Sequence, residues 1–154
     1  MEDIAESAPL ELVAPPWAIR GSLVTGFPDL GLGVSFTFVA AELLSLEVGA
    51  STILFQSTVY GRVGARLPLE AGPRHAWTLT PALGYRGQET RFFDLSRMGG
   101  PTATVALDWF WGKPDRAVFD LQLSVGVLGI LVDPTNDHAS DVWPDCRLSY
   151  GVAF

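Results

Sequence analysis

Hydrophobic and polar residues alternate along almost the whole chain after its first sixteen residues. In the segment 30–38, for example, Leu32, Val34, Phe36 and Phe38 fall on one face, and small or polar residues fall on the other. This period is typical of β-strands, whose successive side chains point to opposite faces. The pattern predicts eight strands, at about residues 17–27, 30–38, 44–53, 57–69, 76–87, 101–111, 116–128 and 145–154.

The connections between these segments indicate how the strands are arranged. Those after the second, fourth and sixth strands are short, whereas 88–100 and 129–144 are long. Strands joined by short turns are antiparallel neighbours. We therefore expect an up-and-down meander, with the long loops at one end and both termini at the other. Closure into a barrel removes the unpaired edges, and eight strands enclose a space that side chains can fill. The sequence predicts an all-β, antiparallel eight-stranded barrel.

Two kinds of barrel fit the alternation, because a soluble barrel turns its apolar face inward and a transmembrane barrel turns it outward. The polar face is mostly Gly, Ala, Ser and Thr, which suit a crowded lumen, and the apolar face is bulky on every strand. The apolar lengths, about nine to eleven residues, match a tilted crossing of the hydrocarbon layer. The pattern favours a transmembrane barrel over residues 17–154, with a soluble, lipocalin-like carrier as the alternative.

Aromatic residues near the strand ends add to this interpretation. Trp and Tyr suit a membrane–water boundary, where the ring is in apolar surroundings and its polar atom stays hydrated. The residues expected to form this aromatic girdle are Trp17, Phe27, Trp77, Tyr85, Trp109, Trp111 and Phe154.

Composition and charge narrow the choice of function. Hydrophobic residues make up 48% and charged residues only 18%, against roughly 25% charged in a typical soluble domain. No apolar run approaches the roughly 18 residues of a transmembrane helix. A net charge of −7 counts against a nucleic-acid partner. Cys146 is the single cysteine, so neither an internal disulfide nor a metal site is expected, and no cofactor is predicted.

The last strand, CRLSYGVAF, ends on an aromatic residue, with hydrophobic residues at alternate positions: Leu148, Tyr150, Val152 and Phe154. This resembles the C-terminal assembly signal of bacterial outer-membrane β-barrels, and with the meander the chain resembles a small barrel of the OmpA/OmpX type, over residues 17–154. The resemblance implies a Gram-negative outer membrane, contact with its lipid and lipopolysaccharide, and recognition of the last strand by the barrel assembly machinery. It also implies turns and termini in the periplasm and long loops outside.

The N-terminal residues 1–16 carry no strand pattern. They have an acidic start and lack the basic region and apolar core of a signal peptide. We expect them to be an N-terminal periplasmic extension, and, if the protein is exported, the chain to be the processed form with a starting methionine.

In a membrane barrel the charged residues of the strands would face the lumen. They are Arg20, Glu47, Arg62, Arg66, Arg86, Asp108, Asp120 and Arg147. Buried charges persist when they are paired, so we predict an Arg–carboxylate network that plugs the barrel. Pairing around the third connection sets Glu47 near Gly64, between Arg62 and Arg66. The network would act either as a gating or selectivity element or as a polar core that fixes register. The small lumen favours the polar core and no open pore.

A second part of this network is expected around two aspartates. Counting back from the GKPDR turn sets Asp108 roughly opposite Asp120, with Arg20 or Arg147 nearby. Paired carboxylates also suit general acid–base catalysis. Neighbouring arginines would keep both ionised, however, which removes the acid.

The last long loop contains a different candidate for catalysis. His138 and Ser140, with Asp145 as a carboxylate, are similar to the triad of outer-membrane lipid A deacylases. They lie in a loop rich in Pro and Asp rather than on a strand, and the residues flanking the family's His–Ser pair are missing. A solvated histidine is the alternative, as it is for His75. The acidic residues of this loop would hold calcium only weakly, since their spacing matches no EF-hand: Asp133, Asp137, Asp141 and Asp145.

The loop ETRFFDLSRMGGP places Phe92, Phe93 and Met98 among charged residues. Exposed aromatics of this kind mark a protein-partner surface, fold over the barrel mouth or touch lipid headgroups. The leading hypothesis is a non-enzymatic outer-membrane barrel with a structural, adhesion or partner-binding role. A lipid-modifying membrane enzyme and a soluble carrier are the alternatives.

Overall fold

The computed structural model describes residues 11–26, 29–53, 56–90, 98–113, 116–130 and 141–154. These residues form nine strands: β1 Trp17–Gly26, β2 Asp29–Ala40, β3 Leu44–Ile53, β4 Gln56–Ala65, β5 Leu67–Ala71, β6 His75–Thr90, β7 Met98–Trp111, β8 Val118–Ile130 and β9 Asp141–Ala153. Among them there is no helix with the length and apolar character needed to cross a membrane.

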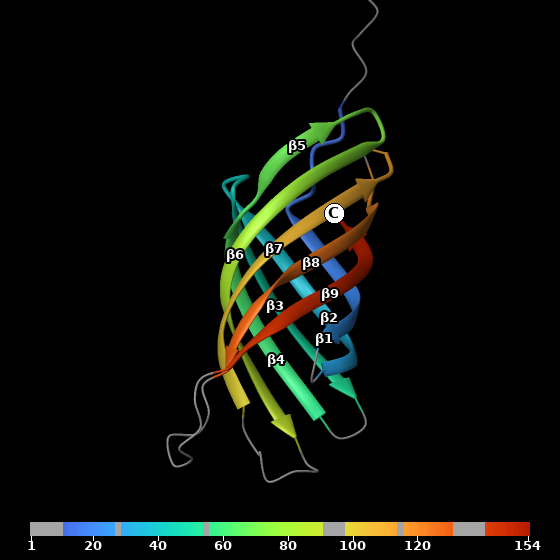
Figure 1. Ribbon diagram of the computed structural model, residues 1–154. Helices are drawn as coiled ribbons and strands as arrows, with labels where there is room; N and C mark the ends of the chain where they lie inside the picture. The colour runs from blue at the N-terminus through green and yellow to red at the C-terminus, as the bar shows by residue number, and fades with distance from the viewer. Residues whose placement is uncertain (1–10, 27–28, 54–55, 91–97, 114–115, 131–140) are drawn as a thin grey trace, which may run out of the picture.

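The strands close into a single antiparallel barrel (Figure 1). Each strand from β1 to β4 pairs with the next, β6 to β9 do the same, and the β1–β9 and β4–β6 pairs close the ring. The short strand β5 also pairs with β6, so β4 and β5 act as one interrupted strand. With β4 and β5 counted as one strand, the barrel has eight strands, which confirms the predicted all-β, eight-stranded antiparallel fold.

The interruption between β4 and β5 lies opposite a proline. The pairs that β4 and β5 make with β6 follow the same register on both sides of the break, and in this register Ala65 would face Pro81. Proline has no N–H to donate to the ladder. The residue opposite it therefore receives no backbone donor from β6, whereas the Arg66 N–H on the β3 side donates to the carbonyl of Leu43, at 2.6 Å. Pro81 thus accounts for one predicted strand becoming two.

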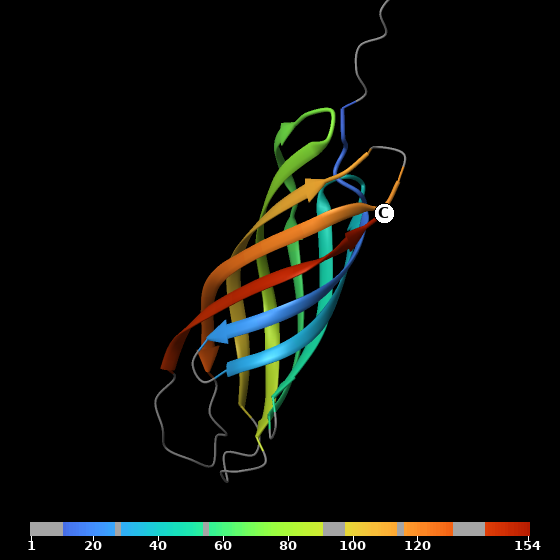
Figure 2. The ribbon, with the colours of Figure 1, turned by 90° about the vertical axis from the view of Figure 1, so that its right-hand side faces the viewer.

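The two ends of the barrel differ in their connections. The β2–β3, β5–β6 and β7–β8 connections lie at the end that also holds the C-terminus and residues 11–16, at the top of Figure 1; we call this the turn end and the opposite one the loop end. Both views show a tall barrel whose strands are tilted to its long axis (Figure 2).

At the loop end the strands run further than the alternation predicted. The β6–β7 ladder continues to Gln88 and Met98, and the β8–β9 ladder to Ile130 and Asp141. The loops were therefore predicted too long, because strand residues extend from both sides into the expected loop ranges 88–100 and 129–144. Polar and glycine residues in these strand extensions interrupt the hydrophobic alternation but not the backbone pairing, so the sequence pattern missed them.

The wall of the barrel is apolar outside and polar inside. Exposed large hydrophobic side chains occur on every strand from β1 to β9, including Val34 at 64% and Leu83 at 67% exposed. The inward positions of the same strands carry buried Ser, Thr, Arg, Asp and Glu, such as Arg20 at 1% exposed. Water-soluble proteins place charges outside and apolar side chains inside, so this arrangement is the reverse of a soluble barrel.

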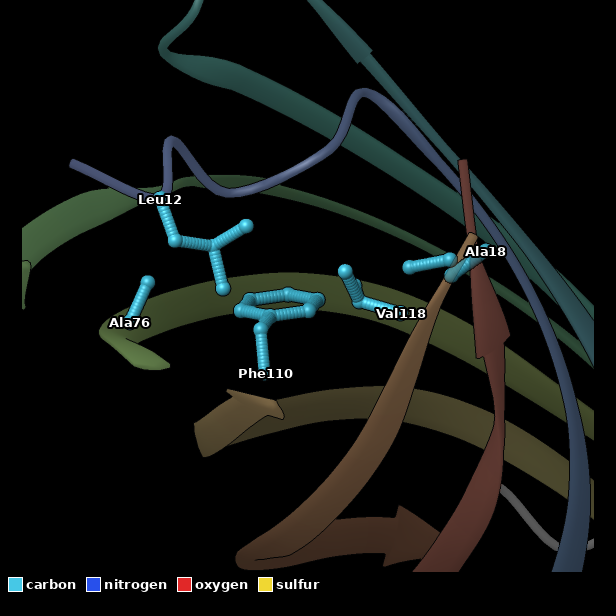
Figure 3. Packing of buried hydrophobic residues seen from close by; sticks show 6 residues of the cluster. Leu12, Ala18, Ala76, Phe110 and Val118 are labelled. Atoms are coloured by element: carbon cyan, nitrogen blue, oxygen red, sulfur yellow. The ribbon is translucent and has the colours of Figure 1, made fainter. Parts of the chain in front are cut away.

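A small apolar cluster closes the turn end of the interior (Figure 3). Leu12, from the segment before β1, lies over the ring of Phe110, next to Ala76 and Val118. Leu12 is 2% exposed and Phe110 is fully buried. The sequence prediction missed this cluster because its strand members stand on the otherwise polar face and Leu12 lies before the first strand.

Residues 11–16 form a strap across this end, which we call the N-terminal strap. Its backbone is held at both ends, by the Leu12 N–H donating to the Gly72 carbonyl and the Val39 N–H donating to the Pro16 carbonyl, both at 2.8 Å. The described part of the predicted N-terminal extension, residues 11–16, therefore lies against the end of the barrel. A buried leucine makes these residues part of the barrel's packing.

Candidate functional site in the barrel interior

All eight charged residues expected in the lumen are buried on the inner face, with exposures of 9% or less: Arg20, Glu47, Arg62, Arg66, Arg86, Asp108, Asp120 and Arg147. The alternation of each strand places them there, because each stands an even number of residues from small polar inward neighbours. The register between strands then decides which of them meet.

Arg20 of β1 joins the two aspartates. Its Nε donates to Asp120 Oδ2 at 2.6 Å and its Nη2 to Asp108 Oδ1 at 3.0 Å. The two aspartates are not opposite each other as expected, because Asp108 pairs with Gln122 and Asp120 with Phe110. This offset of two residues lets one guanidinium lie between two carboxylates. Arg20, rather than Arg147, is thus the arginine at the aspartates.

Glu47 of β3 forms ion pairs with three arginines. Its Oε2 accepts from Arg62 Nη2 at 2.7 Å and lies 3.5 Å from Arg20 Nη1, and its Oε1 accepts from Arg147 Nη1 at 3.3 Å. Arg20 therefore links the Glu47 group to the aspartates. The network crosses the lumen between strands on opposite sides of the barrel.

The expected pairing of Glu47 with Arg66 is wrong. Glu47 stands directly opposite Arg62, and Gly64 stands opposite Ser45, so the true register is shifted by two residues from the one counted from sequence. Arg66 instead donates from Nη1 to the Pro15 carbonyl in the N-terminal strap, at 2.6 Å. The prediction of the face was right, and the prediction of the partner failed with the register.

Arg86 forms a separate ion pair nearer the loop end. Its Nη1 lies 3.2 Å from Asp145 Oδ1, and both side chains are buried. The sequence analysis placed Asp145 in the acidic loop and beside the His–Ser pair, whereas the structure places it inward on β9. The side chains of the other proposed calcium ligands and of the proposed triad lie outside the described residues: Asp133, Asp137, His138, Ser140 and Asp141. Elsewhere in the described chain, no cluster of three or more His, Cys, Asp or Glu residues could hold a metal ion.

Tyr60 is a further member of the network that the sequence analysis missed. Its hydroxyl donates to Glu47 Oε1 at 3.0 Å, and the Arg147 guanidinium lies 3.5 Å from its ring centroid. The ring occupies the space beside Gly49, where a Cβ would meet it. An aromatic residue on the polar face of the predicted fourth strand was the available signal.

Neutral polar side chains complete the network. The Gln122 amide donates to Asp108 Oδ1 at 2.7 Å and accepts from Arg62 Nη2 at 2.8 Å, and Thr37 accepts from Arg20 Nη1 at 2.6 Å. The cavity among these groups measures about 10 Å³, which is room for about one water molecule. The centre of the lumen is therefore filled by side chains. Each buried carboxylate has an arginine partner, which suits a structural network better than proton transfer.

The expected aromatic girdle is concentrated at the turn end. Trp17 lies against Phe38, with ring centroids 4.1 Å apart, and Trp77 stacks on Trp109 at 5.7 Å. Trp111 and Phe154 are exposed at the same end. Tyr85 is exposed on the half of β6 that leads to the loop end, and Phe27 lies outside the described residues. The described residues of the expected girdle therefore lie mainly at one end of the barrel.

The fold and the interior together define a closed eight-stranded antiparallel barrel with an apolar exterior and an ionic core. The barrel resembles the N-terminal β-barrel domain of OprF from Pseudomonas aeruginosa, with a TM-score of 0.58 and 12% sequence identity over 92% of this chain and 100% of that domain. No protein-family model matches the sequence. No curated protein matches it either. The likeness therefore lies in the fold.

Proposed function

We propose that the chain is an integral outer-membrane β-barrel with a structural, adhesion or partner-binding role. The observation that carries the proposal is the inverted wall, with Val34 and Leu83 about two-thirds exposed while Arg20 and Asp120 are buried. Such a wall exposes far more contiguous apolar surface than a soluble monomer tolerates. Hydrocarbon outside and hydrogen-bonded charges inside would satisfy both surfaces. The fold shared with the OprF barrel domain supports the same proposal.

The proposed barrel is closed to ions and has no catalytic role. The arginine network leaves about 10 Å³ at the centre of the lumen, whereas a conducting pore needs a continuous water path. The described buried carboxylates are each engaged by an arginine, which supports a structural role for them. We assign the network to filling the lumen and fixing strand register.

The partners we propose follow from the surfaces. Outer-membrane lipid and lipopolysaccharide would cover the apolar wall, and the barrel assembly machinery would recognise β9, whose outward residues Leu148, Tyr150 and Val152 are exposed. A protein partner would bind at the long connections of the loop end. No nucleic-acid partner is proposed.

Gel mobility provides the first experiment. The chain, purified in detergent, is run in SDS with and without boiling. A membrane barrel should remain folded in unheated SDS and shift on boiling, because its backbone hydrogen bonds are closed within the ring. Removal of detergent should cause aggregation. A single unshifted band, or a monodisperse protein in water without detergent, would contradict the proposal. Ion currents across a planar bilayer containing the folded barrel would contradict the closed lumen.

A further inference from the structure

A cavity of about 500 Å³ opens at the turn end, beside the N-terminal strap. It lies between the strap, the β2–β3 turn, β5 and the start of β6. Most of its walls are apolar, and they include Leu12, Val13, Val39, Pro68, Ala76 and Trp77. The volume falls within the range of small-molecule sites, about 300–1,000 Å³. This cavity adjoins the filled centre of the lumen at Arg66, which lines both.

Arg66 lines this cavity and has an unusual environment. It is 3% exposed, its guanidinium lies 5.3 Å from the centroid of the Phe110 ring, and Nη1 donates to the Pro15 carbonyl. Its Nε is buried without a hydrogen-bond partner, and no carboxylate among the described residues forms an ion pair with it. The direct contacts of this guanidinium are a neutral acceptor and an aromatic ring, and the carboxylates of the central network act on it only from beyond ion-pair distance, so its charge is incompletely compensated.

The charges of the interior show the same imbalance. Among the described residues, five arginines and four carboxylates are buried. The carboxylates are engaged by Arg20, Arg62, Arg86 and Arg147. Arg66 is the remaining positive charge, and it is the one that faces an open cavity.

We propose that this cavity binds a single-chain anionic amphiphile. Its carboxylate or phosphate would lie at Arg66, because a guanidinium matches the geometry of both groups, and its hydrocarbon chain would lie along the apolar walls. The cavity is next to the aromatic girdle, since Trp77 contributes to both, so an amphiphile would reach it from the lipid boundary. Glu42 and Glu70 also line the cavity. Both are exposed, so solvent screens their repulsion more than it screens the attraction of Arg66.

Binding of dodecanoate to the full chain, purified in a non-ionic detergent, tests the proposal. Displacement of a fluorescent fatty acid reports the affinity. We expect dodecanoate to bind and Arg66→Gln to weaken its binding by about tenfold or more. Arg66→Lys keeps the charge but loses the planar fork, so its affinity should lie between those of the wild type and Arg66→Gln. The matched control is Arg74→Gln, which removes an exposed arginine at the same end and should change nothing. Dodecanol should bind equally to the wild type and Arg66→Gln.

Three results would overturn the proposal: no binding of dodecanoate to the wild type, equal affinity in Arg66→Gln, or an equal loss of dodecanol and dodecanoate binding. The affinity for dodecyl phosphate, measured in the same way, shows whether the cavity prefers a phosphate or a carboxylate headgroup. If Arg66→Gln does not fold, the double variant Glu42→Gln/Glu70→Gln is used instead. It removes two negative charges from the cavity and should bind dodecanoate a few-fold more tightly. An unchanged or weaker affinity would count against the site. The gel mobility shift on boiling is measured on every variant. A variant that still shows the shift but does not bind dodecanoate contradicts the amphiphile site alone, whereas loss of the shift in the wild type contradicts the proposed membrane barrel.

Discussion

The centre and the turn end of the barrel both bury arginine side chains, but the positive charge is compensated differently at the two places. At the centre, Arg20 lies within 3.5 Å of oxygens of Asp120, Asp108 and Glu47. At the turn end, Arg66 has a backbone carbonyl and the Phe110 ring, under an apolar strap. The difference shows that position on the inner face does not by itself make a residue part of the ionic network. The network forms where the register brings opposite charges together, and the end is closed by apolar packing.

The largest expected effect is loss of the central arginine. Arg20→Met would leave Asp108 and Asp120 without their ion-pair partner, and removal of one member of a buried pair costs about 3–5 kcal/mol. Arg66→Met, the matched variant at the turn end, leaves no carboxylate stranded and should cost only about 1–2 kcal/mol for a lost hydrogen bond and ring contact. Urea unfolding of the protein in lipid vesicles measures both. Equal losses would remove the distinction between the centre and the end.

The exterior should show the same contrast between centre and end. Leu123, which pairs with Leu107 and Leu148 at mid-strand, is expected at the middle of the hydrocarbon layer. Leu123→Arg should lower the free energy of unfolding by about 2–4 kcal/mol, whereas Trp111→Arg near the turn end should cost about 1 kcal/mol or less from the charge itself. The same vesicle experiment compares them. A larger effect at Trp111 would place the membrane boundary elsewhere.

The strap is predicted to contribute through one side chain. Leu12→Ala removes a side chain that is 2% exposed and leaves a cavity above Phe110, and such substitutions cost about 2 kcal/mol or more. Val13→Ala is the control, since Val13 is 76% exposed and should change stability by less than about 0.5 kcal/mol. Thermal loss of the fast-running band in unheated SDS reports the difference. An unaffected Leu12→Ala would mean that the strap does not close the barrel.

The sequence predicted the eight strands of the barrel, their antiparallel direction and the inward orientation of each charged residue, because alternation depends only on local chain geometry. It predicted the partners only in part: Arg62 at Glu47 and Arg20 at the aspartates are found, whereas the direct neighbours across the strands were wrong. Asp108 and Asp120 were expected to be opposite each other, and Glu47 was expected beside Arg66. Both errors are shifts of two residues, which leave every face unchanged and change every neighbour. Register depends on turn geometry and on contacts across the lumen, and neither is visible in a single strand.

The apolar turn end and the strap were missed for a different reason. Phe110 and Val118 stand at inward positions, where the alternation led us to expect polar groups, and Leu12 lies outside the alternating segments altogether. Asp145 was predicted as the first residue of the last strand and was also grouped with the acidic loop before it, because the residues before it lack a clear pattern. Local periodicity identifies the strands and their apolar outer face, and it says little about the ends of the barrel, where packing between residues distant in sequence decides the structure.

The smallest effect concerns a glycine in the central network. A Cβ at Gly49 would meet the ring of Tyr60, which holds Glu47 through its hydroxyl and lies against Arg147. Gly49→Ala should therefore cost about 1 kcal/mol or slightly more through overpacking, and it should shift the tyrosine from Glu47. Gly61→Ala is the control on the outer face, where a Cβ meets atoms no closer than 3.9 Å. Alanine there should be neutral or stabilising by a few tenths of a kcal/mol. Unfolding in vesicles, together with the near-ultraviolet signal of Tyr60 compared between the variant and Tyr60→Phe, reports both effects. If the two glycine variants behave alike, the packing of Tyr60 on Gly49 does not help to hold the central network in place.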